Sequence, residues 1–167
     1  HAICEKFLPW VKQGRRLYIA VDGIYLDRLS LFTGIDLETL EQQITLWKDS
    51  VEVLQAFPHV EPGSAVIIDE AQTVFRSMQK VEPGLLRWLE THRHYGVDIL
   101  LMSQDFRQMS QGVTRLIEAT VKFRKLAFVG LSKKYQGKVR GNPEDNEVIR
   151  AFVVTYSPAI YAYYSSY

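Results

Sequence analysis

Two short apolar runs in the middle of the chain predict buried β-strands. The first is Ala65–Ile68, which follows the turn residues Pro62 and Gly63, and the second is Val97–Met102. A strand that is buried on both faces carries apolar side chains at consecutive positions, as in parallel sheets covered by helices. Other apolar segments predict further strands at 15–21, 44–47 and 121–129.

Helical spacing predicts helices between these strands. In the opening segment Ile3, Phe7, Leu8 and Val11 recur on one helical face, and Asp36 and Pro83 suit the starts of later helices. The predicted helices cover this opening segment and residues 37–43, 50–57, 83–95 and 110–119. The remaining stretches predict an irregular connection or short strand at 24–34, a loop at 72–79, a hairpin tip or mobile loop at 133–146, and Val- and Tyr-rich strand-like segments at 147–156 and 159–164.

The alternation of strands and helices predicts an α/β domain with a mostly parallel sheet and a β-rich C-terminal appendage. A length of 167 residues suits a single domain. We expect an α/β core over about 1–130 and a β-rich extension over about 131–167.

Composition excludes few functions, but the charge is unevenly placed. The net charge is +1, yet nine Lys or Arg and only four acids follow Val113. Such a basic segment indicates either a polyanion-facing surface or a solvated face. Cys4 is the only cysteine, so an internal disulfide and a cysteine zinc cluster are excluded, and a reducing compartment is expected. The sequence contains no apolar run of membrane-spanning length and no recognisable signal peptide.

Two adjacent carboxylates, Asp69 and Glu70, follow the strand Ala65–Ile68 directly. In open α/β sheets ligands bind at the carboxyl ends of the strands, where these acids would lie. One interpretation is a magnesium-holding acid, Asp69, followed by a water-activating acid, Glu70. The other is a helix N-terminus, which favours negative charge.

The amide of Gln104 follows the next predicted strand and would reach the same edge of the sheet. Nucleoside-triphosphate hydrolysis needs a Mg²⁺ ligand, a group that orients water and a group that senses the γ-phosphate. Asp69, Glu70 and Gln104 supply those three chemical types. Taken alone, Gln104 is equally well explained as a polar residue that leaves a strand.

Arg93 lies between two histidines, His92 and His94, near the end of a predicted helix. Residues two apart do not share a helical face, so joint metal ligation by the histidines is not expected. Arg93 either donates its charge to a phosphate, in its own subunit or a neighbour's, or belongs to a solvated helix terminus. Tyrosines of the tail suggest base stacking or, more simply, half-buried sheet positions; they are Tyr156, Tyr161, Tyr163, Tyr164 and Tyr167.

Three segments together resemble the zonular occludens toxin (Zot) family, which includes the assembly and export ATPases of filamentous phages. They are residues 66–72 around the acid pair, 91–99 with the His-Arg-His-x-Gly-x-Asp pattern, and 102–104. The ending at 161–166 also looks like the close of the family's N-terminal domain. Nothing in these residues argues for a toxin activity.

The resemblance implies a three-layer P-loop NTPase domain with ATP and Mg²⁺ as cofactors. Asp69 matches the Walker B magnesium acid, Glu70 the catalytic acid and Gln104 the γ-phosphate sensor, while Arg93 is a candidate arginine finger. The resemblance further implies a ring-like oligomer, tethered to the cytoplasmic face of the bacterial inner membrane by a later transmembrane helix. Its expected partners are phage assembly and outer-membrane export proteins, with indirect handling of single-stranded phage DNA.

The phosphate-binding loop G-x-x-x-x-G-K-[ST] does not occur in these 167 residues. Either this loop and the strand before it precede His1, or the protein lacks them; we expect the first, because the opening helix looks like the one that would follow the loop. An ATPase motor is therefore the leading hypothesis. A non-hydrolysing structural or interaction module on the same fold is the runner-up, and a helicase-like or packaging ATPase is a third, more distant reading.

Overall fold

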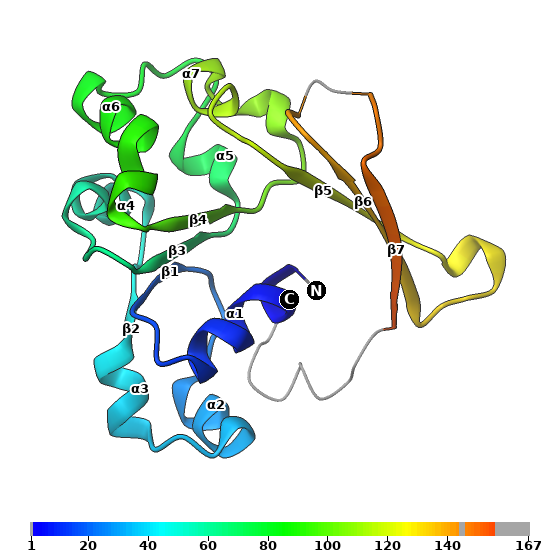
Figure 1. Cartoon of the computed structure of the whole chain (residues 1–167), viewed down its shortest axis with the longest axis horizontal. Coiled ribbons are helices and arrows are strands. Elements are labelled where there is room, and N and C mark those ends of the chain that lie inside the picture. Colours follow the sequence, from blue (N-terminus) through cyan, green and yellow to red (C-terminus); the bar gives the residue numbers. More distant parts are fainter. Residues whose placement is uncertain (1, 144–145, 156–167) are drawn as a thin grey trace.

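The computed structural model describes residues 2–143 and 146–155. Figure 1 shows an α/β part and a separate antiparallel sheet. The α/β part contains four parallel strands in the order β2-β1-β3-β4. Their bounds are β1 Leu17–Ala20, β2 Ile44–Leu46, β3 Ala65–Ile68 and β4 Asp98–Leu101. The predicted parallel sheet is thus confirmed.

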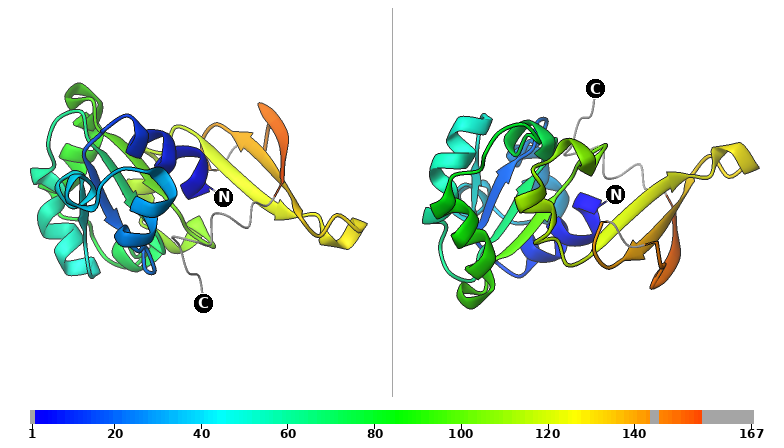
Figure 2. Two further views of the ribbon diagram at one scale, coloured as in Figure 1. Left: turned by 90° about the horizontal axis from the view of Figure 1, so that it is seen from below. Right: turned by 90° about the horizontal axis from the view of Figure 1, so that it is seen from above.

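Alternate residues of β3 belong to two hydrophobic cores on opposite faces of the sheet. Val66 and Ile68 pack into one core with α4 Ser50–Ala56 and α6 Pro83–Thr91. Ala65 and Ile67 pack into the other with α1 Ala2–Lys12, α2 Leu26–Thr33 and α3 Leu37–Gln43. All four side chains of β3 are fully buried. This two-sided burial explains the apolar run and confirms the three-layer arrangement, which Figures 1 and 2 show from three sides.

Local signals set the helix boundaries that the sequence predicted. Asp36 accepts a hydrogen bond from the backbone N–H of Thr39, and Asp49 caps α4 in the same way. The helix predicted at 83–95 is α6 followed by a 3-10 turn at His92–Tyr95. Gly96 then ends it in the left-handed conformation, with φ of 66°.

Three connections differ from the prediction. Residues 24–34, predicted as irregular or a short strand, contain α2, which is anchored by the fully buried Leu29. Tyr25 at its N-cap makes no side-chain capping bond, so the usual start signal is missing. The predicted loop at 72–79 begins inside α5 Ala71–Val74, whereas the helix predicted at 110–119 is only α7 Gln111–Thr114.

The antiparallel sheet has the order β5-β6-β7. Its strands are β5 Thr120–Lys125, β6 Lys134–Arg140 and β7 Arg150–Thr155. The prediction of a hairpin tip or mobile loop at 133–146 is therefore wrong, because seven of these residues form the central strand. The strand predicted at 121–129 ends at Lys125 and joins this sheet, so the β-rich region begins before residue 131. The segment predicted at 159–164 and the tail tyrosines lie outside the described residues.

Gly137 lies at the centre of β6, where the ring of Phe152 occupies the space that a Cβ would take. It pairs with Phe123 on β5 and with Phe152 on β7. The two rings meet edge to face, with centroids 6.2 Å apart. A glycine within the segment predicted as a hairpin tip or mobile loop is therefore a packing position in a strand. No helix in the described ranges 2–143 and 146–155 is both long and apolar enough to cross a bilayer.

Candidate functional site

Backbone hydrogen bonds to both neighbouring strands hold the segment that follows β3. The N–H of Asp69 donates to the carbonyl of Ala20 on β1 at 2.8 Å, and the N–H of Ala71 donates to the carbonyl of Met102 after β4 at 2.9 Å. Glu70 lies between these two anchored residues. The chain is thus held on either side of Glu70 at the carboxyl edge of the sheet.

Glu70 has a left-handed backbone conformation, with φ of 48° and ψ of 42°. Among the described residues it is the only one other than glycine with positive φ. This conformation costs a residue with a Cβ about 1–2 kcal/mol, so the surrounding hydrogen bonds must maintain it. The carboxylate of Glu70 is therefore exposed at the edge of the sheet, where it can accept hydrogen bonds.

Two amide side chains donate to the Glu70 carboxylate. The Nε2 of Gln104 lies 2.9 Å from its Oε1, and the Nε2 of Gln72 donates to its Oε2. The structure thus brings Gln104 to the acid pair, as expected for side chains that leave neighbouring parallel strands. Sequence reasoning missed Gln72, although its position two residues after Glu70, at the start of a helix, was a usable signal.

Asp69 is half-buried beside Glu70. Its Oδ1 accepts a hydrogen bond from the N–H of Glu70 at 2.8 Å. Burial raises the pKa of Asp69, and the nearby charges of Glu70 and Asp22 raise it further, while the hydrogen bond from Glu70 partly opposes them. Asp22 follows the end of β1, and the sequence analysis did not include it in the site. Asp22 follows a strand that is parallel to β3, and this position could have indicated that it lies at the same edge of the sheet.

Arg93 is not brought to this group. It lies in the turn His92–Tyr95, which precedes β4, whereas Asp69 and Glu70 follow β3. Because β3 and β4 are parallel, Arg93 is at the amino edge of the sheet and the acids are at the carboxyl edge. Its guanidinium pairs with Glu118, and both side chains remain more than half exposed. Within one chain Arg93 therefore does not reach Asp69 or Glu70.

The donor set at the carboxyl edge suits a hard cation only in part. Carboxylate and amide oxygens are the ligands that Mg²⁺ prefers, and Mg²⁺ commonly keeps waters and takes phosphate oxygens as well. Within residues 2–143 and 146–155, no three His, Cys, Asp or Glu side chains are grouped to hold a metal by themselves. Asp69 would thus be one ligand among several, with the others supplied by water and a phosphate.

A pocket of about 230 Å³ lies elsewhere, between α4, α5 and the segment that leads to α6. Leu54, Val74 and Leu85 are among its lining residues, whereas Asp69, Glu70 and Gln104 are not. It is partly open to solvent, and polar residues such as Arg76 and Glu82 also line it. The carboxyl edge, with its ordered acids and amides, remains the candidate site.

A parallel sheet covered by helices on both faces, with acids at its carboxyl edge, defines an open α/β domain of the class that binds ligands at that edge. The chain belongs to the zonular occludens toxin (Zot) family, whose family profile matches residues 1–167. The Gene 1 protein of Xanthomonas phage phiLf is 24% identical over 181 residues, which cover 99% of this chain and 41% of that protein. The chain thus spans about two fifths of the length of this relative.

Solved structures share the fold. The N-terminal domain of zonular occludens toxin from Neisseria meningitidis matches with a TM-score of 0.58 and 18% identity, covering 90% of this chain and 80% of that one. The genome packaging NTPase B204 from Sulfolobus turreted icosahedral virus 2, in complex with AMPPCP, matches with a TM-score of 0.57 and 14% identity, covering 93% and 90%. At these identities the likeness concerns the architecture.

Proposed function

We propose that Asp69, Glu70 and Gln104 form the acidic half of an ATP-hydrolysing site. The observation that carries the proposal is the hydrogen bond from Gln104 to Glu70, at 2.9 Å, at the carboxyl edge beside Asp69. This arrangement couples an acid that would act on water to an amide on the neighbouring strand. Phosphoryl transfer depends on such positioning, together with charge neutralisation.

Each residue has a distinct role in this proposal. Asp69 is the carboxylate that would hold Mg²⁺; a bound Mg²⁺ neutralises phosphate charge. Glu70 accepts a hydrogen bond from the attacking water and orients it, since its carboxylate is exposed. Gln104 holds the Glu70 carboxylate in place and would respond to the γ-phosphate, because its amide can exchange one acceptor for another.

The wider function follows from the family and from the relatives' names. One relative is a phage gene 1 protein, and one structural neighbour is a genome packaging NTPase. The proposed protein is an ATPase for assembly and export of filamentous phage, acting as a ring-like oligomer at the cytoplasmic face of the bacterial inner membrane. Its Walker A loop and membrane helix would lie outside this sequence, and its partners would be phage assembly and outer-membrane export proteins.

The decisive experiment compares Glu70→Gln with the unchanged intact protein in its assembled state. We expect Glu70→Gln to abolish ATP turnover and to leave nucleotide binding largely intact, since only the group that orients water is neutralised. Glu90→Gln removes an equal charge from an exposed position of α6 and should leave turnover unchanged. If the unchanged protein hydrolysed ATP no faster than the Glu70→Gln variant, the proposal would be refuted. A non-hydrolysing structural or interaction module would then be favoured.

A further inference from the structure

The antiparallel sheet has one mainly apolar face, which also carries Lys125 and Arg150, and one cationic face. Side chains alternate between the faces of a strand, and paired residues on adjacent strands share a face. One face carries Phe123, Gly137 and Phe152 in a single row. The opposite face carries five Lys or Arg and no acid among its strand positions. We name it the cationic face; its basic residues are Lys122, Arg124, Lys134, Lys138 and Arg140.

The cations are arranged along the strands, not in a compact cluster. In the register, Arg140 lies opposite Thr120, and Lys138 lies opposite Lys122. Arg124 comes in the next row, opposite Gln136, and Lys134 follows in the row of Thr155. Successive rows on one face are about 7 Å apart, so at least one positive charge occurs every 7 Å or so over about 20 Å.

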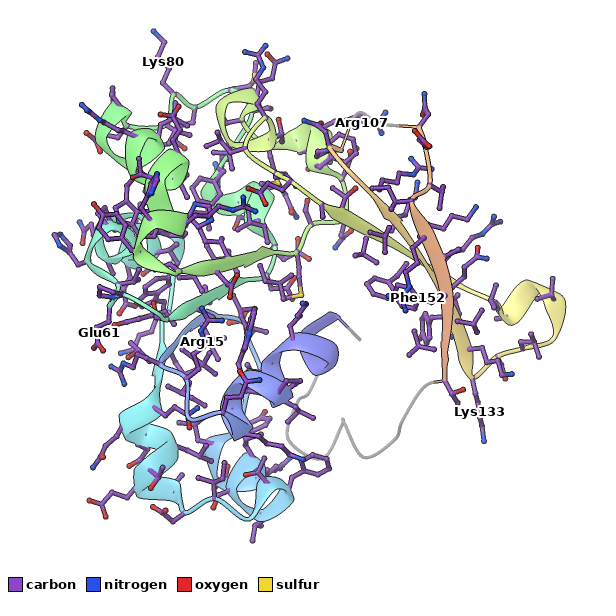
Figure 3. All side chains as sticks on the ribbon, viewed as in Figure 1. Arg15, Glu61, Lys80, Arg107, Lys133 and Phe152 are labelled. Carbon is purple, nitrogen blue, oxygen red and sulfur yellow. The ribbon has the colours of Figure 1, made fainter. Side chains whose placement is uncertain are left out.

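Most of these charges face solvent. Lys122, Arg124, Lys134 and Lys138 are exposed, and Arg140 is half-buried. In Figure 3 Phe152 lies on the side of β7 that faces the α/β part, which places the alternate, cationic face on the outer side. Figure 2 shows the sheet projecting from the α/β part, so a long ligand has access to this side.

Two acids near the cationic face, Asp105 and Glu118, are paired with arginines outside that face. Lys122 contributes to the lowered pKa of Asp105, but the main cause of that shift is the hydrogen bonds from Arg107. Asp105 accepts from the Arg107 guanidinium through both carboxylate oxygens. Glu118, just before β5, is paired with Arg93. The positive charge of the face is therefore not neutralised by these neighbours.

We propose that the cationic face binds the phosphodiester backbone of nucleic acid. A line of charges about 20 Å long complements a linear polyanion better than a single phosphate or carboxylate group. The strand positions of this face include no aromatic residue, so binding takes place through phosphates, without base stacking or sequence readout. A membrane surface is less well matched, because Val153 is the only large apolar residue at these positions that could insert into lipid.

The proposal does not depend on ATP hydrolysis, so it can be tested without nucleotide. The probe is a fluorescently labelled oligothymidylate, titrated with the intact protein at several salt concentrations. Five phosphate contacts predict a slope of log K against log salt of about −3.5. The double variant Lys134→Glu with Lys138→Glu should bind at least about tenfold more weakly at low salt. Three phosphate contacts would remain, so the slope of log K against log salt should change to about −2.

Two controls separate this face from general charge. Lys48→Glu with Lys80→Glu makes the same change in net charge on the α/β part and should weaken binding far less. Lys125→Glu changes the opposite face of the sheet and should also have little effect. Protected amides of β6 in hydrogen exchange would show that each variant keeps the sheet.

Several outcomes would overturn the proposal. These are no binding of oligothymidylate, equal weakening by both double variants, or preference for vesicles of anionic lipid over the oligonucleotide. An oligouridylate should bind as the oligothymidylate does, because no group of the face is placed to read the bases or the sugar.

Discussion

Replacement of Gly137 by Ala tests whether the aromatic row holds the antiparallel sheet together. A Cβ at this position would lie 2.7 and 2.9 Å from two carbons of the Phe152 ring, and closer still to its Cζ. These distances are too short for any real contact, so the ring must move away. Gly137 is not among the glycines with positive φ, which means that its backbone conformation alone would accept alanine.

The two effects of this substitution have opposite signs. Removing glycine from a compatible position usually stabilises a protein by about 0.4–1 kcal/mol, through the entropy of the unfolded chain. Overpacking against a large ring usually destabilises it by about 1–3 kcal/mol. We expect the clash to dominate, so that Gly137→Ala lowers the stability of the sheet by about 1–2 kcal/mol.

A double-mutant cycle with Phe152→Ala isolates the clash. In that background the ring is absent, and Gly137→Ala should be neutral or stabilising by up to about 1 kcal/mol. Hydrogen exchange of the β6 amides measures the local effect. The three tryptophans, Trp10, Trp47 and Trp88, all lie in the α/β part, and their fluorescence serves as a control for its unfolding. An equal effect of Gly137→Ala in both backgrounds would refute the packing explanation.

Three other predictions concern charged groups. Asp69→Asn should raise the melting temperature at neutral pH, because the folded-state pKa of Asp69 is raised and its ionisation disfavours folding. The gain should vanish at a pH below 3.8, the ordinary pKa of an aspartate, where Asp69 is protonated in both the folded and the unfolded state. A gain that is independent of pH would exclude this cause. Arg15→Lys should cost about 2 kcal/mol in urea unfolding, since Arg15 donates to three backbone carbonyls and pairs with Asp98, whereas Arg87→Lys should change little. Arg93→Ala and Glu118→Ala should each cost under about 1 kcal/mol, because the pair is exposed. If Arg93 acts across subunits, only Arg93→Ala should slow hydrolysis by the assembled protein while leaving nucleotide binding by the monomer intact; equal losses in both would remove that role.

The sequence alone determined the parts of the fold that depend on local signals or on complete burial. Ala65–Ile68 had to be apolar at every position, since one face of β3 packs into each core. Asp36 and Pro83 marked helix starts through short-range hydrogen bonds and a fixed φ. The position of Asp69 and Glu70 after a buried strand is sufficient to place them at the carboxyl edge of a parallel sheet.

Only the tertiary structure decided the features that join distant residues. The segment around Gly137 looks like a hairpin tip or mobile loop in the sequence, because the aromatic partners of this glycine, Phe123 and Phe152, are 14 and 15 residues away. The left-handed conformation of Glu70 depends on hydrogen bonds to both flanking strands, which no local pattern encodes. Arg93 lies in another of the three family-like segments but at the opposite edge of the sheet, because parallel strands separate residues before one strand from residues after its neighbour. The cationic face, similarly, exists only once pairing register has brought alternate residues of two strands to one side.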